Sequence, residues 1–297
     1  MPSSLSQHRI GIICAFAAFF LWGIFPVYFK MVDYIQPFEM LCHRIIWSVL
    51  LLLAALYFSR GFSELKIVFS SLRTVTLLFI TGVLITLNWF TYIYAVMHNM
   101  IAEASLGYFI NPLVNITLGM LFLKEKTSIL EKIAIFIAFL AIALEIIKLG
   151  SIPYIALTLA FSFGFYGLIR KMMRVGSFTG LFVETLLIAP LAVGYLIYLG
   201  FSNKLNFSFD STIWLIALSG PITVIPLLLF ANAASRIRLT TVGFIQYLSP
   251  TITLSLAILV YNEPLSISRA ITFALIWLSL IFVIADSFIQ KQKRNIK

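Results

Sequence analysis

The chain has 297 residues, of which 61% are hydrophobic and 11% charged, and its mean hydropathy is +1.04. A soluble domain is typically about 45–50% apolar and about 25% charged, so soluble enzymes, soluble nucleic-acid binders and disordered chains are excluded. In a membrane protein, a net charge of +10 usually reflects Lys and Arg in cytoplasmic loops, so we expect no nucleic-acid partner. Cys14 and Cys42 lie in apolar runs, where buried thiols are more frequent than disulfides. The composition predicts a polytopic protein embedded in a lipid bilayer.

Ten apolar runs are long enough to cross a bilayer as helices, which takes about 20 residues each. They cover about 10–29, 37–58, 75–97, 102–123, 129–148, 151–171, 178–200, 211–235, 239–261 and 267–289. The connections are short, and the longest polar one covers about 59–74. The runs at 129–148 and 267–289 carry few polar residues, so we expect them at the lipid-facing periphery.

The distribution of Lys and Arg predicts the orientation of these helices. With ten spans and both termini inside, 16 of the 21 basic residues fall in cytoplasmic segments and 4 on the opposite side, while Arg44 lies within a span. Cytoplasmic segments of membrane proteins are enriched in Lys and Arg. The pattern therefore predicts ten spans with cytoplasmic N- and C-termini.

The two halves of the chain resemble each other in register. A shift of 138 residues places Pro112 on Pro250 and Glu125 on Glu263, and a shift of 141 places Gly23 on Gly164. Because each half has five helices, the second copy enters the membrane upside down. We therefore predict an all-α fold of two inverted five-helix repeats, residues 1–149 and 150–297, with a site between them at mid-membrane.

A polar stripe marks one face of the fourth span, and the shift of 138 repeats it in the ninth. Its positions recur at steps of three and four residues, which keeps them on one helix face. The stripe comprises Tyr108, Asn111, Asn115 and Gly119, repeated as Gln246, Ser249, Thr253 and Ala257. The first two positions of each set lie beside prolines and predict a cavity face. The last two fit either a cavity or helix–helix packing.

Glycine and proline interrupt several spans, and they have two interpretations. One is a kink that frees backbone carbonyls toward a wet cavity, and the other is a tight helix crossing. The positions are Gly23, Pro26, Pro112, Gly164, Gly167, Pro226 and Pro250.

Ionisable residues inside spans are the sharper indication of a site, because a charge at the bilayer centre costs about 2.5–3.5 kcal/mol on insertion scales. His43 and Arg44 lie in the second span, and Glu184 lies at the equivalent depth of the seventh. We expect Arg44 either to line the cavity, where it would hold a substrate carboxylate, or to pair with Glu184. His43, with an ordinary pKa of about 6.5, is the candidate for proton coupling.

Aromatic residues in the spans could stack on a flat substrate. They are Trp22, Tyr28, Trp89, Tyr92, Tyr166 and Tyr247. The three histidines show no metal-ligand spacing, and the sequence has neither a GxxxxGK[ST] nor a GxSxG motif. We therefore expect no metal, no cofactor and no catalytic residue.

Several strings resemble the EamA family of the drug/metabolite transporter superfamily, and within it the RarD-type permeases. They are EASLGYFINPLVN at 103–115, FSFGFYGLIRK at 161–171, GFIQY at 243–247 and HRIIWS at 43–48. One departure is that EamA repeats often carry Gly-Glu after the fourth helix, whereas this chain has Lys124-Glu125 and Asn262-Glu263.

The resemblance implies ten helices in two repeats, a central cavity and export of metabolites or drugs across the bacterial inner membrane. RarD-type proteins are described as chloramphenicol permeases, and chloramphenicol or amino-acid-like compounds are therefore candidate substrates. The predicted function is a secondary transporter working by alternating access. The alternative is a non-transporting membrane sensor or an intramembrane enzyme.

Overall fold

The computed structural model describes residues 4–59, 62–98, 100–149, 152–206, 213–261 and 267–295. Within these ranges the regular structure is entirely helical. The helices are α1 (Ser4–Met31), α2 (Pro37–Ser59), α3 (Phe62–Phe69), α4 (Leu72–Met97), α5 (Ile101–Phe122), α6 (Ile129–Leu149), α7 (Tyr154–Met172), α8 (Ser177–Phe201), α9 (Ile213–Ala217), α10 (Ser219–Arg236), α11 (Leu239–Gln246), α12 (Leu248–Leu259) and α13 (Ile267–Asn295). The prediction of an all-α protein is confirmed.

Each predicted apolar run coincides with one long helix or with two consecutive helices. In the part of the chain that the structure describes, eight of these stretches are long and apolar enough to cross a membrane. The other two are α6, which carries Glu131, Lys132, Glu145 and Lys148, and α13, whose apolar part spans Ala270–Asp286. The protein is therefore a multi-pass membrane protein.

The structure differs from the predicted spans in two places and from a predicted loop in a third. The eighth run is divided at Leu218 and the ninth at Tyr247. In each case a proline follows three residues later, Pro221 or Pro250, and its missing N–H leaves the carbonyl just before the break without a helical donor. The predicted polar connection at 59–74 contains the short helix α3.

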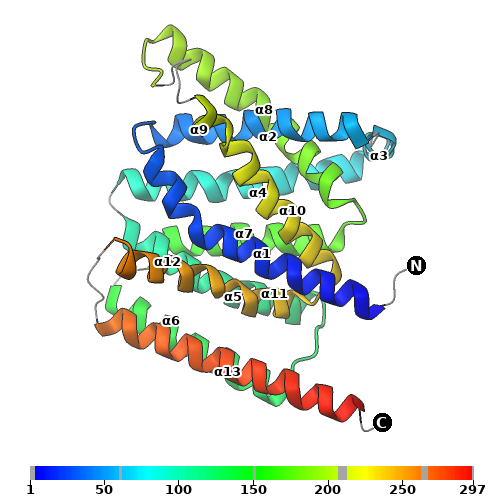
Figure 1. The fold of residues 1–297 in the computed structure, drawn as a ribbon, viewed down its shortest axis with the longest axis vertical. Coiled ribbons are helices and arrows are strands. Elements are labelled where there is room, and N and C mark those ends of the chain that lie inside the picture. Colours follow the sequence, from blue (N-terminus) through cyan, green and yellow to red (C-terminus); the bar gives the residue numbers. More distant parts are fainter. Residues whose placement is uncertain are drawn as a thin grey trace.

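The helices run roughly side by side, with α2, α4 and α8 at one edge and α6 and α13 at the other (Figure 1). Between them lie α1, α5, α7, α10, α11 and α12. α13 packs mainly on α6, which confirms the predicted position of these two helices at the periphery. α1 begins and α13 ends on the same side of the bundle.

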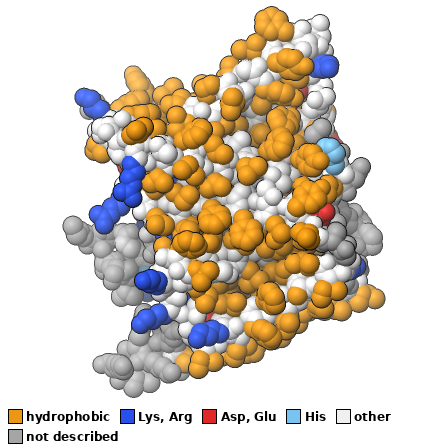
Figure 2. Space-filling model, turned by 180° about the vertical axis from the view of Figure 1, so that it is seen from behind, with side chains coloured by type: hydrophobic (Ala, Val, Ile, Leu, Met, Phe, Trp, Pro, Cys, Tyr) orange, Lys and Arg blue, Asp and Glu red, His pale blue; other side chains and the backbone are white. Residues whose placement is uncertain are grey.

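Apolar side chains cover the face seen in Figure 2 in a broad band, and most Lys and Arg side chains lie along its left edge. That edge is the side on which α1 begins and α13 ends. Many large apolar side chains of the described residues are exposed, among them Phe136 at 61% and Ile281 at 61%. Such a surface suits hydrocarbon rather than water.

The interior contacts join helices that are distant in sequence. α5 packs on α7 and α1 packs on α12. α4 packs on α7 and α1 packs on α10, while α4 also meets α8 and α2 meets α10. Three further pairs, α2 with α8, α5 with α11 and α6 with α13, complete the main packing.

Two of the predicted kink glycines are sites of tight helix crossing. A Cβ added at Gly23 of α1 would lie 2.7 Å from Ile252 of α12, and one at Gly164 of α7 would lie 2.6 Å from Val114 of α5. The helices continue unbroken through both glycines and through Pro26, Pro112 and Pro226. Of the two interpretations of the glycines, the structure supports close packing.

Gly243 lets the backbones of α11 and α5 approach closely, and this predicts a stability difference. An added Cβ would lie 2.7 Å from the Pro112 carbonyl oxygen, whereas one at Gly194 of α8 meets nothing within 4 Å. Because a backbone atom cannot rotate away, Gly243→Ala should cost about 1–3 kcal/mol, the usual range for overpacking. Gly194→Ala is the control, and thermal unfolding in detergent measures both. Equal melting temperatures would contradict the tight crossing.

Candidate functional site

Arg44 lies at the centre of a contact between α2 and α10. The side chain is buried, with 9% of its surface exposed, and its Nε donates a hydrogen bond to Thr223 Oγ1 at 2.9 Å. One turn further along α2, the Ser48 hydroxyl donates to the Arg44 carbonyl oxygen at 2.5 Å. The hydroxyl of Thr223 is neutral, so this contact orients the guanidinium without neutralising its charge.

Aromatic side chains from three helices surround this guanidinium. Its central carbon lies 4.7 Å from the ring centroid of Trp89 on α4 and 5.6 Å from that of Phe29 on α1. Both distances fit cation–π contacts. The predicted residues Tyr28, Tyr92 and Tyr108 also lie near Arg44. The structure thus brings together five of the predicted site residues: Tyr28, Arg44, Trp89, Tyr92 and Tyr108.

Exposure differs sharply among these tyrosines. Tyr28 is 8% exposed and its hydroxyl donates to the Leu215 carbonyl oxygen at 3.0 Å. Tyr108 is 43% exposed, and its ring contacts that of Tyr92 edge-on at a centroid separation of 6.0 Å. Tyr108 is therefore the most accessible aromatic group beside the buried Arg44.

His43, the neighbour of Arg44, belongs to a separate polar cluster. Its Nε2 lies 3.8 Å from Oε1 of Glu39, one turn earlier on α2. Glu39 is fully buried, and its Oε2 accepts hydrogen bonds from the backbone N–H and the side-chain amide of Asn206, at 3.0 and 3.2 Å. Glu39 was not singled out from the sequence, although its i, i+4 spacing to His43 marks it as a partner.

Glu184 pairs with Arg170 rather than with Arg44, which corrects one of the two expectations for Arg44. Arg170 Nη1 lies 3.5 Å from Glu184 Oε1, and both side chains are buried, with 2% and 1% of their surfaces exposed. The Thr81 hydroxyl donates to Glu184 Oε1 at 2.7 Å, and the Tyr166 hydroxyl donates to Oε2 at 3.5 Å. The pair thus connects α4, α7 and α8 inside the bundle.

Arg170 lies at the end of the run predicted at 151–171, and the charge count included it among the cytoplasmic residues with Lys171 and Arg174. In the structure it belongs to the last turn of α7 and points into the bundle against Gly180 of α8, where an added Cβ would lie 1.9 Å from Nη1. A count of charges along the sequence does not show that Arg170 points into the bundle. Nor does it show that Gly180, which has no side chain, leaves the space for Arg170.

The residues of the predicted polar stripe have two different roles in the structure: some form a buried amide pair, and others pack helices together. Asn115 Nδ2 of α5 donates to Gln246 Oε1 of α11 at 2.6 Å. Oδ1 of Asn111 and Oδ1 of Asn115 are buried without a hydrogen-bond partner within the described ranges. In contrast, the Thr253 hydroxyl donates to the Gly23 carbonyl oxygen at 3.1 Å, which fits helix–helix packing.

Three other predicted aromatic residues pack into the core. Trp22 contacts Phe163 at a centroid separation of 5.5 Å, and Tyr166 stacks on Phe230 at 6.0 Å. Tyr247 is fully buried, and its hydroxyl reaches the Phe109 carbonyl oxygen at 3.5 Å. Ser249, the remaining predicted position, is partly exposed on α12.

A second set of polar contacts joins the helix ends on the side where α1 begins. Glu125 accepts hydrogen bonds from the backbone N–H groups of Leu239 and Thr240, at 2.7 and 2.9 Å, and so caps α11. A carboxylate is favourable at a helix N-terminus because of the helix dipole. Lys171 lies 4.0 Å from Glu125 and donates to the Ala234 carbonyl oxygen near the end of α10. Glu263, the repeat counterpart of Glu125, lies outside the described residues.

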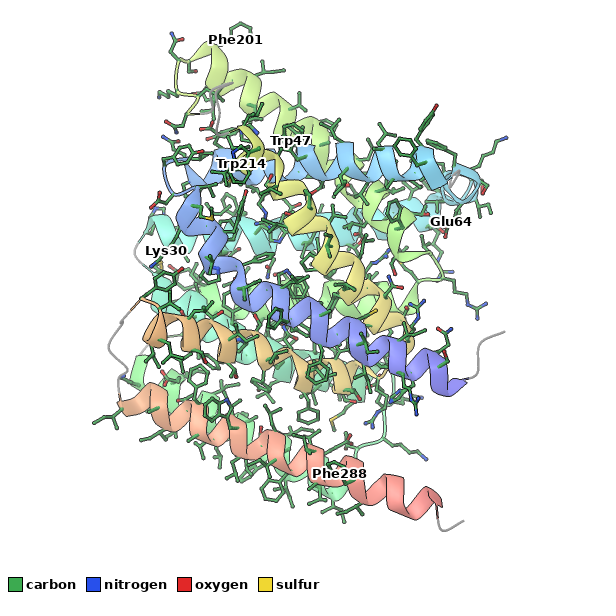
Figure 3. The ribbon with its side chains drawn as sticks, viewed as in Figure 1. Lys30, Trp47, Glu64, Phe201, Trp214 and Phe288 are labelled. Carbon is green, nitrogen blue, oxygen red and sulfur yellow. The ribbon has the colours of Figure 1, made fainter. Side chains whose placement is uncertain are left out.

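Glu64 adds a contact at this same end of the bundle, opposite the end that carries Lys30 (Figure 3). It accepts a hydrogen bond from the Gly176 N–H at 2.8 Å and another from the Thr179 hydroxyl, so α3 is attached to the start of α8. At this end the described connections are therefore held by specific polar bonds.

The long apolar helices surround buried charged and aromatic side chains. The protein is therefore a multi-pass α-helical membrane protein with polar groups in its interior. Comparison with known proteins makes the class specific. The model of the EamA-like transporter family matches residues 9–147 and again residues 151–285. The chain belongs to this family and is a membrane transporter of the drug/metabolite transporter superfamily.

Its relatives include proteins with matching length. The chain is 44% identical over 283 residues to "Uncharacterized transporter YojE" of Bacillus subtilis, covering 93% of this chain and 94% of that protein. It is 41% identical to "Protein RarD" of Escherichia coli over 98% and 99% of the two chains. A "Chloramphenicol-sensitive protein RarD" of Pseudomonas aeruginosa is 24% identical over 96% and 97%. A solved crystal structure with 20% identity shares the fold, with a TM-score of 0.70 over 93% of this chain and 96% of that one.

The Arg170–Glu184 pair predicts non-additive effects on stability. Removing one partner leaves the other charge buried and unpaired, a loss of about 3–5 kcal/mol in buried pairs, whereas removing both is far less costly. We expect Glu184→Gln and Arg170→Met each to lower the melting temperature in detergent, and the double variant to regain part of the loss. Arg174→Met, which removes an exposed charge nearby, is the control. Simple additivity of the two losses would contradict a direct pairing.

Proposed function

We propose that the protein is a secondary transporter that moves small metabolites or drugs by alternating access, with the substrate held between its two halves. The observation that carries this proposal is that buried polar contacts cross from one half to the other. Arg44 binds Thr223, and Asn115 binds Gln246. Contacts of this kind can rearrange when two halves rock around a central site.

The packing pattern supports an inverted repeat of residues 1–149 and 150–297. In the proposed repeat, α1 corresponds to α7, α4 to α10 and α5 to α12. The contact of α5 with α7 then corresponds to the contact of α12 with α1, and the contact of α4 with α7 to the contact of α10 with α1. The glycine crossings follow the same relation, because Gly23 meets Ile252 while its counterpart Gly164 meets Val114, the counterpart of Ile252. Such matched contacts are expected when two copies of one unit pack around a pseudo-two-fold axis.

The proposed topology has ten spans, with α6 and α13 added to the eight that satisfy length and composition, and both termini in the cytoplasm of a bacterium. It is supported by the gathering of Lys and Arg on the side where α1 begins and α13 ends (Figure 2). The membrane would then be the inner membrane.

The substrate path is proposed to run past Tyr108, whose exposed ring lies near the buried Arg44. The contacts of Glu125 and Lys171 with α10 and α11 would close the cytoplasmic end in this conformation. Asn111 and Gln246 would add neutral hydrogen bonds, and His43, next to Arg44 and paired with Glu39, would couple a proton. Chloramphenicol and amino-acid-like compounds remain the candidate substrates, the first because a relative is named for it.

Counterflow in proteoliposomes tests the proposal. Vesicles preloaded with an unlabelled compound should accumulate its labelled form transiently if a carrier exchanges them, and the panel should contain chloramphenicol and amino acids. Arg44→Ala should lower the exchange at least about tenfold, since it removes a charged group from the proposed site. Arg73→Ala, which removes an exposed arginine of α4, should leave it unchanged. Absence of exchange by folded protein across a wide panel of metabolites would favour the sensor or enzyme alternative.

Cysteine labelling tests the orientation. In a background with Cys14 and Cys42 replaced by alanine, a membrane-impermeant maleimide added to spheroplasts should modify Tyr34→Cys but spare Lys126→Cys. Both native residues are exposed, and they lie at opposite ends of the helices. Permeabilised cells, in which both positions should react, are the control. The reverse pattern of labelling would overturn the proposed orientation.

A further inference from the structure

We propose that the transported compound is a small organic anion, whose carboxylate binds Arg44 and whose apolar or aromatic body lies against Trp89, Tyr92 and Tyr108. This inference rests on the proposed function and names the substrate class of the same site. It starts from the charge of Arg44. A buried cation without a counter-ion is costly in a protein interior, so an anion that enters the site gains an interaction that the protein itself leaves open.

No carboxylate within the described residues forms an ion pair with Arg44. Two carboxylates of the neighbouring elements are already engaged: Glu184 by Arg170 and Thr81, and Glu39 by His43 and Asn206. A third, Glu103 in the first turn of α5, forms no ion pair with Arg44, although its Oε2 is buried without a hydrogen-bond partner within the described residues. Tyr28, Tyr92 and Tyr108 lie near Arg44, and a neutral phenol does not offset its charge. This separates Arg44 from Arg170, which has a buried acidic partner of its own.

The site also has the donors that an anion requires. Among the described residues, the Arg44 side chain forms one hydrogen bond, through Nε, so its two terminal nitrogens can each donate an N–H group to a carboxylate. Within the described ranges the hydroxyls of Tyr92 and Tyr108 donate to no protein acceptor, and both tyrosines lie near Arg44, with their rings in edge-on contact. A carboxylate between these groups would accept bonds from the guanidinium and from one or both phenols.

The aromatic rings near Arg44 favour an anion with an apolar or aromatic body. Trp89 lies 4.7 Å from the guanidinium carbon, and the exposed ring of Tyr108 provides a second flat surface near the same charge. Stacking and apolar contact on such rings favour a compound with a hydrophobic or aromatic body over a strongly hydrated anion such as inorganic phosphate. The net preference is for an amphipathic monocarboxylate, of which an aromatic amino acid and a free aromatic acid are both examples.

The test uses pairs of compounds that match in shape and differ in charge: benzoate with benzamide, and phenylacetate with phenylacetamide. Binding to the purified full chain in detergent is read from the melting temperature and from quenching of the fluorescence of Trp89, with Trp89→Phe identifying its share of the signal. We expect the acids to raise the melting temperature and the amides to have no effect at equal concentration. Arg44→Gln should weaken acid binding about ten- to a hundredfold, as expected for loss of a charge-assisted hydrogen-bonded pair, and Arg44→Lys should weaken it less.

Arg73→Gln is the matched control, because it removes an exposed positive charge from α4 and should leave acid binding unchanged. Equal binding of acids and amides, retention of acid binding by folded Arg44→Gln, or no binding of either acid would each overturn the inference. Because these measurements need no transport, they separate the two proposals. Acid binding that depends on Arg44, without counterflow of either acid, would contradict carrier function alone, whereas counterflow of neutral compounds only would contradict the anion.

Discussion

The constraint on which the rest of this structure depends is that hydrocarbon accepts no hydrogen bonds and solvates no charges. Every polar group along these helices must find its partner inside the protein or face a wet space. Glu184 finds Arg170, Thr81 and Tyr166, and Glu39 finds Asn206 and His43. Within the described residues, the Arg44 side chain has one hydrogen-bond partner, the neutral Thr223, together with aromatic faces. This difference between satisfied and unsatisfied charges separates the proposed substrate site from the structural ion pairs.

The same constraint bears on the contacts between residues 1–149 and residues 150–297. Apolar and small side chains also meet between the halves, as in the tight crossing of Gly23 against Ile252. Polar contacts between the halves lie inside the bundle, as at Asn115 with Gln246, and at both ends, where Glu125 caps α11 and Glu39 accepts hydrogen bonds from Asn206. Rearrangement of the halves would require these bonds to break or to be exchanged. The end contacts are therefore candidate gates of the proposed transport cycle.

Local sequence signals were reliable where one residue type has one physical role. Apolar runs located the long helices. Prolines were a weaker signal, because Pro221 and Pro250 follow the breaks at Leu218 and Tyr247 but the helices continue through Pro112 and Pro226. The signals failed where a residue has two roles. Arg170 resembled a basic loop residue but lies buried against Gly180, and Gly23 and Gly164, which could have been kinks, make tight crossings. In each case the outcome depends on a neighbour from another helix.

Hydropathy and motif strings alone identify the chain as an all-helical, multi-pass membrane protein of the EamA-like family, because both are properties of the amino-acid order. They also named Arg44, Tyr92 and Tyr108 as members of one candidate site, since few polar residues occur within the spans. Which acid accompanies which base follows only from the three-dimensional arrangement of the helices. Pairing of buried charges depends on distances of a few ångströms between helices, and periodicity along one helix carries no information about the rotation of its neighbour.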